Sequence, residues 1–189
     1  MNQAEDIKKA VEVLRKGGVI LYPTDTVWGI GCDATNAEAV SRVYAIKHRD
    51  DSKALICLVD SDARLQRYVR DVPAVAWELL DVVTKPTTVI LDGAVNLAPN
   101  LIADDGSIAL RITQEPFSKE LCYRFQKALV STSANISGEP AAANYCDISD
   151  DIINAVDYVC FSRRQERKPH TPSGIIKLKS DGEVTIIRK

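Results

Sequence analysis

Residues 19–32 read Val-Ile-Leu-Tyr-Pro-Thr-Asp-Thr-Val-Trp-Gly-Ile-Gly-Cys, and the prediction of the fold starts from this stretch. Two short apolar runs, residues 19–22 and 27–32, are rich in strand-forming residues, and Pro23 ends the first run. We therefore predict two strands joined by the polar turn Thr24-Asp25-Thr26. The turn has two interpretations: a structural turn bonded to its own backbone, or a ligand site at a strand end of an α/β sheet.

Helical and strand patterns alternate along the rest of the chain. A helical stripe at residues 7–14 ends at Gly17-Gly18, a capping box at residues 35–38 starts a helix that leads to Lys47, and residues 72–83 and 116–125 form further helical faces. Strands are expected at residues 54–59, 89–91, 108–112, 128–130, 158–161, 174–178 and 184–187. Asp181-Gly182 predicts a hairpin between the last two strands, which excludes an all-parallel sheet. The sequence thus predicts a single α/β domain over residues 1–189, with a twisted mixed β-sheet flanked by helices.

Composition narrows the class of protein. The chain has 189 residues, of which 46% are hydrophobic and 26% charged, which is the balance of one globular domain with a sizeable core. The net charge of -2 gives no overall positive field for nucleic acid. No apolar run approaches the roughly 20 residues of a membrane helix, and the polar start differs from a signal or transit sequence. We therefore expect a cytoplasmic protein without membrane association.

Metal and standard phosphate motifs are missing from the sequence. The five cysteines are odd in number, none are spaced as CxxC, and there are only two histidines, so we expect buried free thiols and no zinc site. Neither GxxxxGK[ST] nor GxGxxG occurs, and Gly29-Ile30-Gly31 is more typical of a strand irregularity than of a phosphate loop. Any nucleotide site must therefore use other residues.

Three further polar clusters have both a structural and a functional interpretation. Lys47, Arg49 and Lys53 follow a helix, where they could be a solvated helix end or a clamp for a polyphosphate. Residues 131–135, Ser-Thr-Ser-Ala-Asn, follow an apolar strand and could form a turn or bind a phosphate or ribose. Arg111 interrupts the strand 108–112, where it could face solvent or hold a carboxylate or phosphate.

Taken in order, these clusters resemble the YrdC family. Residues 22–31 are similar to the first block of that family, and Lys47-x-Arg49 with Ser133-x-Asn135 is similar to its paired signature. Residues 109–111 and 131–138 match two more blocks, so the resemblance runs from about residue 14 to residue 188. It implies a YrdC-like domain with a concave central cleft. Because the chain ends at Lys189, we expect the short form without the extra C-terminal domain of longer relatives.

The resemblance also implies a reaction, the synthesis of threonylcarbamoyl-AMP by a nucleotidyltransferase. The amine of L-threonine captures bicarbonate or CO2 as a carbamate, the carbamate oxygen attacks the α-phosphate of ATP, and pyrophosphate leaves. Mg²⁺ is expected with ATP, and no protein-held metal is expected. The product serves the modification of adenosine 37 in tRNAs that read ANN codons, so tRNA and the threonylcarbamoyl-transferase complex are the expected partners.

Matching the family pattern assigns roles to individual residues. The catalytic group implied is Lys47, Arg49, Ser133 and Asn135. The ATP-binding group contains the same four residues and adds Lys53, Ser107 and Arg188. The threonine-binding group is Thr26, Arg111, Ser131 and Ser173.

Two alternatives to the enzyme stay open. An RNA-binding module would use Lys47, Arg49 and the basic run 163–168, which is either a solvated loop or a lid over the nucleotide. A non-catalytic scaffold of the tRNA-modification complex is supported by departures from the family pattern. These are Asp50 in place of a proline, and Thr-Lys-Pro-Thr-Thr at residues 84–88 in place of a Pro-Gly-Pro-x-Thr block.

Overall fold

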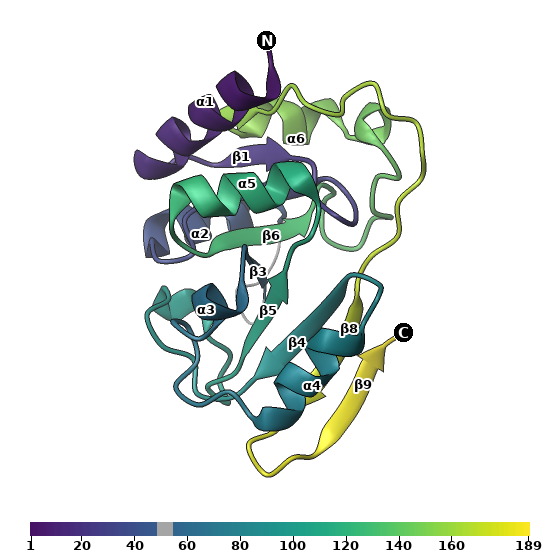
Figure 1. The fold of residues 1–189 in the computed structure, drawn as a ribbon. Helices are drawn as coiled ribbons and strands as arrows, with labels where there is room; N and C mark the ends of the chain where they lie inside the picture. The colour runs from purple at the N-terminus through teal and green to yellow at the C-terminus, as the bar shows by residue number, and fades with distance from the viewer. Residues whose placement is uncertain (49–54) are drawn as a thin grey trace.

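The computed structural model describes residues 1–48 and 55–189, and in this part of the chain nine strands form one mixed sheet (Figure 1). Across the sheet the strand order is β7-β1-β2-β6-β3-β5-β4-β8-β9. In chain order the strands are β1 (Ile20–Tyr22), β2 (Gly29–Gly31), β3 (Ile56–Val59), β4 (Thr87–Leu91), β5 (Ile108–Ile112), β6 (Leu129–Ser133), β7 (Tyr158–Val159), β8 (Gly174–Leu178) and β9 (Val184–Arg188). The pairs β1–β7, β3–β5 and β4–β8 are parallel, and the other neighbours are antiparallel.

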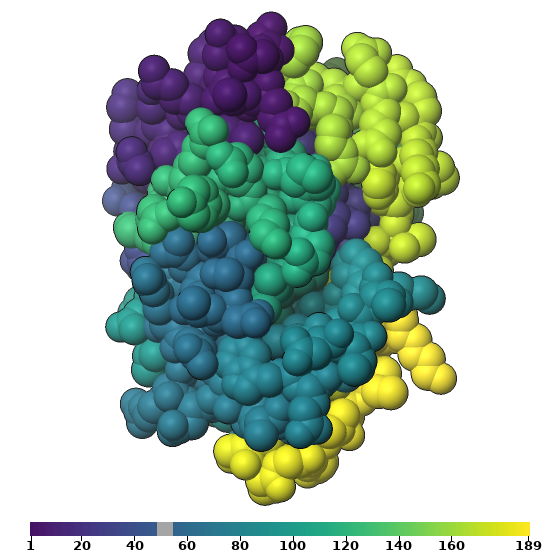
Figure 2. Space-filling view, viewed as in Figure 1, coloured from purple at the N-terminus to yellow at the C-terminus, as the bar shows by residue number. Residues whose placement is uncertain are grey.

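Helices cover both faces of the sheet. They are α1 (Gln3–Arg15), α2 (Ala37–Ile46), α3 (Asp62–Leu65), α4 (Ala74–Val82), α5 (Pro116–Phe125) and α6 (Asp150–Ala155), with 3₁₀ turns η1 (Pro99–Leu101) and η2 (Tyr145–Asp147). Figure 2 shows α1 in purple and α5 in green packed together over one face of the molecule. The predicted α/β fold with a mixed sheet, closed by the β8–β9 hairpin, is confirmed. That residues 1–189 form a single domain stays a prediction.

The two faces of the sheet bury separate apolar clusters because side chains alternate along each strand. Ile20 and Tyr22 of β1 pack with the apolar stripes of α1 and α5, whereas Val19 and Leu21 join the larger cluster with α2. Leu129 and Val130 of β6 divide between the two clusters in the same way. Both strands are therefore buried on both sides, which explains why they appear in the sequence as continuous apolar runs.

Two local predictions were wrong. Helix α2 does not begin with a capping box at Thr35, because the Thr35 hydroxyl donates to Asp33, and Asn36 instead accepts from the backbone N–H groups of Glu38 and Ala39. Strand β6 does not stop before the polar cluster but continues to Ser133, paired with β2 and β3. The hydroxyls of residues 131–133 are thus held by a sheet rather than by a turn.

Candidate active site

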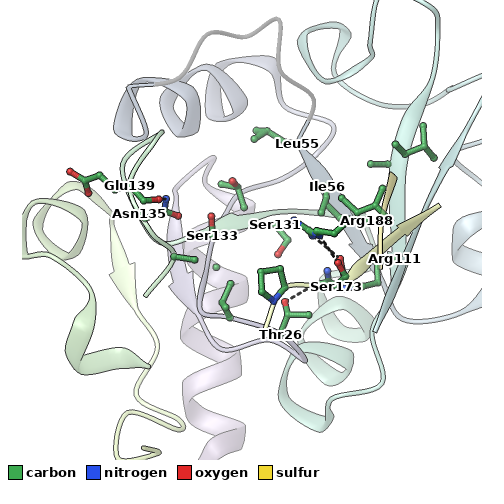
Figure 3. Close-up of a pocket in the computed structure, with 18 residues that line it drawn as sticks. Thr26, Leu55, Ile56, Arg111, Ser131, Ser133, Asn135, Glu139, Ser173 and Arg188 are labelled. Carbon is green, nitrogen blue, oxygen red and sulfur yellow. Dashed lines mark hydrogen bonds between the residues drawn. The ribbon is translucent and has the colours of Figure 1, made fainter. Parts of the chain in front are cut away.

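A cavity of ≈ 370 Å³ lies over the middle of the sheet, where β2, β6, β3, β5, β4, β8 and β9 converge (Figure 3). Its polar side chains divide into two groups: Thr26, Arg111 and Ser173 gather at one end, and Ser133 and Asn135 lie toward the other. Its apolar wall comes from Leu55, Ile56, Ile90, Ala109 and Ile175. An elongated ligand with a charged end and an apolar part would match this arrangement.

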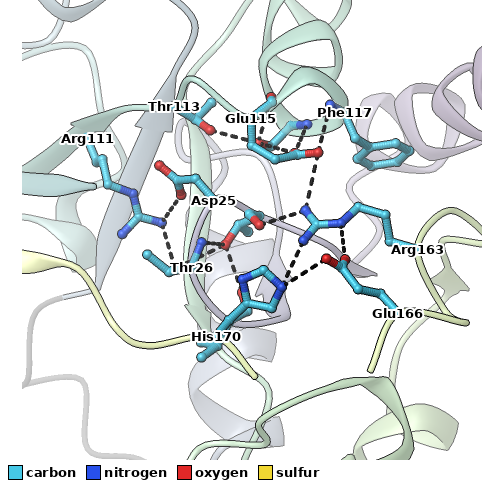
Figure 4. A network of polar contacts seen from close by, with 12 residues as sticks. Asp25, Thr26, Arg111, Thr113, Glu115, Phe117, Arg163, Glu166 and His170 are labelled. Atoms are coloured by element: carbon cyan, nitrogen blue, oxygen red, sulfur yellow. Dashed lines mark hydrogen bonds and ion pairs between the residues drawn. The ribbon is translucent and has the colours of Figure 1, made fainter. Parts of the chain in front are cut away.

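Arg111 is buried in this cavity rather than exposed on a solvated face. Only 3% of the residue is exposed, and its Nη2 atom lies 3.0 Å from Asp25 Oδ1 and 3.2 Å from Thr26 Oγ1 (Figure 4). Burial raises the pKa of the Asp25 carboxyl above its usual value, although the Arg111 cation acts in the opposite direction. Asp25 is therefore an imperfect counter-ion, and Arg111 keeps a strong attraction for a further anion.

The other residues assigned to threonine surround Arg111. Ser131 and Ser173 line the same cavity and are almost fully buried. Ser173 Oγ lies 2.8 Å from Thr88 Oγ1, and Thr88 Oγ1 in turn accepts a 3.5 Å hydrogen bond from Arg111 Nη1. The structure thus brings together all four residues of the predicted threonine group, Thr26, Arg111, Ser131 and Ser173.

Arg188 adds a second guanidinium to the cavity. Its Nε atom donates to the carbonyl oxygen of Ser173 at 2.8 Å. Burial lowers the pKa of Arg188, and the nearby Arg111 cation acts in the same direction. Among the described residues that line the cavity, Glu139 is the one carboxylate, and in Figure 3 its head points away from the arginines. Two arginines with so little acidic compensation favour an anionic ligand.

The nucleotide group is brought together only in part. Ser133, Asn135 and Arg188 line the cavity, whereas Arg49 and Lys53 lie outside the described residues. Ser107 is not among the residues that line the cavity in the described part of the chain. Its hydroxyl donates to Asp105 Oδ1 at 2.6 Å, and its backbone N–H donates to the same atom, so a local turn holds it away.

The structure rejects one of the two sequence interpretations of Lys47, and the phosphate clamp stays a prediction. The residue is only 1% exposed, so it is not a solvated helix end. Its ammonium donates 2.6 Å hydrogen bonds to the carbonyl oxygens of Ser133 and Asn135. Lys47 thereby fixes the backbone that presents these two side chains to the cavity, and no described contact places it on the cavity wall.

Unsatisfied polar atoms concentrate at this site. Four buried side-chain N or O atoms in the described part of the chain lack a hydrogen-bond partner, and three of them are Asp25 Oδ1, Arg111 Nε and Asn135 Oδ1. Such atoms are costly in a folded protein unless another partner satisfies them. Arg111 and Asn135, which line the cavity, thus each carry a buried polar atom that the described residues do not satisfy.

The sequence prediction included Asp25 in a candidate ligand turn without pairing it with Arg111, and it missed the contact of Thr88 with Arg111. It expected buried thiols, and this is confirmed for Cys32, Cys57, Cys122 and Cys160 but wrong for Cys146, which is exposed. In the described residues, no three His, Cys, Asp or Glu side chains approach closely enough to hold a metal ion. No described helix is both long enough and apolar enough to cross a membrane.

Comparison with known proteins identifies the relatives of this chain. The family model Sua5_yciO_yrdC, described as "Telomere recombination", matches residues 12–189. A threonylcarbamoyl-AMP synthase of Vibrio cholerae is 34% identical over 178 residues, which cover 93% of this chain and 94% of the relative. The synthase of Pseudoalteromonas translucida is 35% identical over 161 residues, which cover 84% of this chain and 86% of that one.

Solved structures show the same fold. E. coli YciO superposes with a TM-score of 0.86 at 26% identity, over all of this chain and 90% of YciO. P. abyssi Sua5 complexed with L-threonine superposes with a TM-score of 0.82 at 23% identity, over 94% of this chain but only 52% of Sua5. This chain therefore spans about half the length of Sua5, and that likeness concerns the fold alone. The match of the family model over residues 12–189, together with relatives that align from end to end, establishes that the chain belongs to the Sua5/YciO/YrdC family.

Proposed function

We propose that this protein is an L-threonylcarbamoyladenylate synthase that uses L-threonine, bicarbonate or CO2, and ATP. The curated relatives of nearly equal length carry this name. The observation that carries the proposal is the cavity itself, which holds the guanidinium groups of Arg111 and Arg188 among buried hydroxyls and has unpaired polar atoms at both ends. A carboxylate and a polyphosphate are the anions that such a set would bind.

Arg111 would hold the α-carboxylate of threonine. Its Nε atom has no partner among the described residues, and Asp25 neutralises it imperfectly, so a substrate carboxylate would improve its environment. The hydroxyls of Thr26, Ser131 and Ser173 would hydrogen-bond the amino-acid side chain and amine. When valine enters a pocket that hydrogen-bonds the threonine hydroxyl, a buried polar group of the protein is left without a hydrogen bond. Discrimination between threonine and valine can therefore be large.

The nucleotide would lie toward Ser133, Asn135 and Arg188, with the apolar wall beside the base. Arg49 and Lys53 would join it from the segment between α2 and β3. Lys47 would act by holding the 133–135 backbone in place, because its ammonium is bonded to two carbonyls of that segment. Ser107, which the sequence assigns to ATP, would have to exchange its hydrogen bond with Asp105 for one with the nucleotide.

The chemistry needs no nucleophile from the protein. The threonine nitrogen bonds to the carbon of CO2 and loses a proton, or bonds to the carbon of bicarbonate with loss of water, and either route gives a carbamate. A carbamate oxygen then bonds to the α-phosphorus, and the bond from that phosphorus to the bridging oxygen breaks, which releases pyrophosphate. Arg188 would stabilise the charge that grows on the phosphate oxygens, while Arg111 and the hydroxyls align the threonine with the nucleotide.

Mg²⁺ would enter with the phosphates of ATP rather than reside in the protein. The described cavity offers one carboxylate, Glu139, and neutral hydroxyl oxygens, which suits a cation that keeps most of its ligands from phosphate and water. When bound, the ion would neutralise phosphate charge. The chain's own positive charge near the nucleotide would come from Arg188.

The product of this reaction is an activated mixed anhydride, which water would destroy on release. A transferase must therefore accept it, and we propose the complex that modifies adenosine 37 of tRNAs that read ANN codons as that partner. A cytoplasmic location is proposed on the same ground, because the tRNA substrate is used there.

The deciding experiment measures pyrophosphate release from ATP and Mg²⁺, with threonine and bicarbonate each added or omitted, and with serine or valine in place of threonine. We expect release only with both threonine and bicarbonate. Arg111→Ala should lower kcat/KM for threonine by at least about 100-fold, and Arg111→Lys should recover only part of it because the forked geometry is lost. Arg42→Ala, which removes an exposed ion pair with Asp157, is the matched arginine control and should change nothing.

Background release with every combination of substrates would refute the synthase. Salt-sensitive tRNA binding by the same preparation would then favour the RNA-binding module. Absence of both activities would favour the non-catalytic scaffold.

A further inference from the structure

Residues 160–173 form a strap that connects β7 to β8 along one side of the molecule (Figure 1). The strap delivers Pro172 and Ser173 to the cavity. Its first residues are fixed, because the Asp6 carboxylate accepts hydrogen bonds from the backbone N–H groups of Phe161 and Ser162. Arg164 also turns inward, donating to the carbonyl oxygens of Val159 and Cys160, so the start of the basic run is held to the protein, whereas Arg167 and Lys168 are exposed.

Arg163 ties the middle of the strap to the body of the protein (Figure 4). Its Nη1 atom donates to the carbonyl oxygen of Thr24 at 2.9 Å and lies 3.2 Å from Glu115 Oε1. Its Nε atom donates to Glu166 at 2.6 Å, and Nη2 lies 3.2 Å from His170 Nε2. One guanidinium thus joins three segments: the turn after β1, the first turn of α5 and the strap itself.

The backbone of Arg163 is unusual for such a residue. Its φ of 63° lies in the left-handed region, which a residue with a Cβ atom adopts only at a cost. Glycine, which lacks a Cβ atom, adopts this φ without that cost. The contacts of the guanidinium are therefore the physical reason for an arginine here.

Two series of contacts lead from the strap to Arg111, one starting at Arg163 and the other at Ser173. On one side, Thr24 Oγ1 accepts from the backbone N–H of Thr26 at 3.0 Å, and Thr26 Oγ1 accepts from Arg111 Nη2 at 3.2 Å. On the other side, Ser173 Oγ meets Thr88, which contacts Arg111 Nη1. The strap, the turn after β1 and the strands around Arg111 form a closed ring of polar contacts, and Arg163 closes it.

We propose that Arg163 is a positioning residue for the amino-acid substrate: it locks the strap to the turn after β1, so that Thr26, Arg111 and Ser173 converge on one ligand. This role rests on the proposed function, because it names what sets the geometry of the threonine end of that site. Arg163 itself does not line the cavity in the described part of the chain, and it acts through the segments that do.

The test compares Arg163→Gly, Arg163→Lys and Arg167→Ala in the full-length protein. Arg163→Gly removes the guanidinium while keeping a residue suited to positive φ. Arg167→Ala is the control, because Arg167 is an exposed arginine of the same strap with a local hydrogen bond to Arg164. We expect Arg163→Gly to raise the KM for threonine by about 30-fold while the KM for ATP changes by less than about 3-fold. Arg163→Lys should lie between, and Arg167→Ala should match the wild type.

Amide hydrogen exchange supplies a readout that does not depend on catalysis. Arg163→Gly should speed exchange in residues 161–173 and in the turn 24–26, and Arg167→Ala should not. Faster exchange with an unchanged KM for threonine would overturn the positioning role, and so would unchanged exchange. If the wild-type protein forms no pyrophosphate, the proposed function fails separately, and unchanged exchange would then still overturn the inference about the strap.

Should Arg163→Gly fail to fold, Glu166→Gln provides the second variant. It weakens one ion pair of Arg163 within the strap and leaves the turn and α5 untouched. A smaller rise in the KM for threonine, without a change for ATP, supports the proposal. Equal effects on both substrates would overturn it.

Discussion

Asp6 and Asp25 are two buried carboxylates with opposite environments. Asp6, at the foot of the strap, accepts hydrogen bonds from the Tyr158 hydroxyl at 2.6 Å and from the backbone N–H groups of Phe161 and Ser162. Burial acts to raise the pKa of Asp6, but these hydrogen bonds outweigh it and the pKa is lowered. Asp25, beside the cavity, has one arginine as counter-ion and a raised pKa, with burial as its main cause.

The difference separates a structural carboxylate from one that belongs to a binding site. Because hydrogen bonds within the protein already satisfy the Asp6 carboxylate, it is not available to a ligand. At Asp25 the Oδ1 atom lacks a hydrogen bond of good geometry, and its partner Arg111 keeps an unpaired Nε atom. An under-satisfied buried pair is retained at a cost to stability, which function explains better than folding does.

The largest effect that the comparison predicts is a loss of stability in Asp6→Ala. The substitution removes three partly buried hydrogen bonds to the Asp6 carboxylate, and a hydrogen bond to a charged group contributes about 1.5–3 kcal/mol, so we expect a loss of about 3 kcal/mol. Urea unfolding at neutral pH measures it. Glu12→Ala, an exposed carboxylate on the same helix, should change stability by less than about 0.5 kcal/mol. If Asp6→Ala loses no more stability than Glu12→Ala, the contrast between Asp6 and Asp25 is refuted.

The alternation of strands and helices could be predicted from sequence because central strands such as β1 and β6 are buried on both faces, whereas helices such as α1 and α5 bury one. Periodicity says less about where polar residues end a strand. Residues 131–133 therefore looked like the start of a turn, although they pair with β2 and β3. The order of strands could not be predicted either, since it depends on contacts between segments far apart in the chain.

Site residues divide in the same way. The family resemblance named Thr26, Arg111, Ser131 and Ser173 together, and they share one cavity, although their roles stay predictions. Ser107 does not line the cavity in the described part of the chain, because its hydroxyl donates to Asp105, and its role in binding ATP stays a prediction. The burial of Lys47 was invisible in sequence, since it depends on the 133–135 backbone returning over the end of α2.

Asp25→Asn tests the contrast between the two aspartates and should have an effect of intermediate size. Asparagine keeps the size of the side chain and removes the charge, which relieves the unfavourable burial of the carboxylate but leaves the buried Arg111 without its counter-ion. The two effects oppose each other, so the loss of stability should stay below the loss of about 3 kcal/mol expected for Asp6→Ala. Arg111 loses the ion pair that orients it, and the KM for threonine should change by about 10-fold. Asp157→Asn, which removes the charge from an exposed ion pair, is the control for steady-state kinetics. Destabilisation of Asp25→Asn as large as that of Asp6→Ala would mean that both aspartates are structural.

The smallest effect is a difference in pH dependence, and its sign distinguishes the two residues. The lowered pKa of Asp6 means that its contribution to stability is present above its usual pKa of 3.8 and is lost as the pH falls through the folded-state value. The raised pKa of Asp25 means the reverse: its contribution is present below 3.8 and is lost as the pH rises through the folded-state value. Urea unfolding between about pH 3 and pH 7 should therefore show the advantage of the wild type over Asp6→Asn shrinking in acid, and its advantage over Asp25→Asn growing. One unit of pKa shift corresponds to about 1.4 kcal/mol of unfolding free energy. The test is the sign of the slope: the stability differences of the wild type from Asp6→Asn and from Asp25→Asn should change in opposite directions with pH. If both stability differences change with pH in the same direction, the protein satisfies the Asp25 carboxylate as well as that of Asp6. The raised pKa of Asp25 would then no longer support an anionic ligand in the cavity.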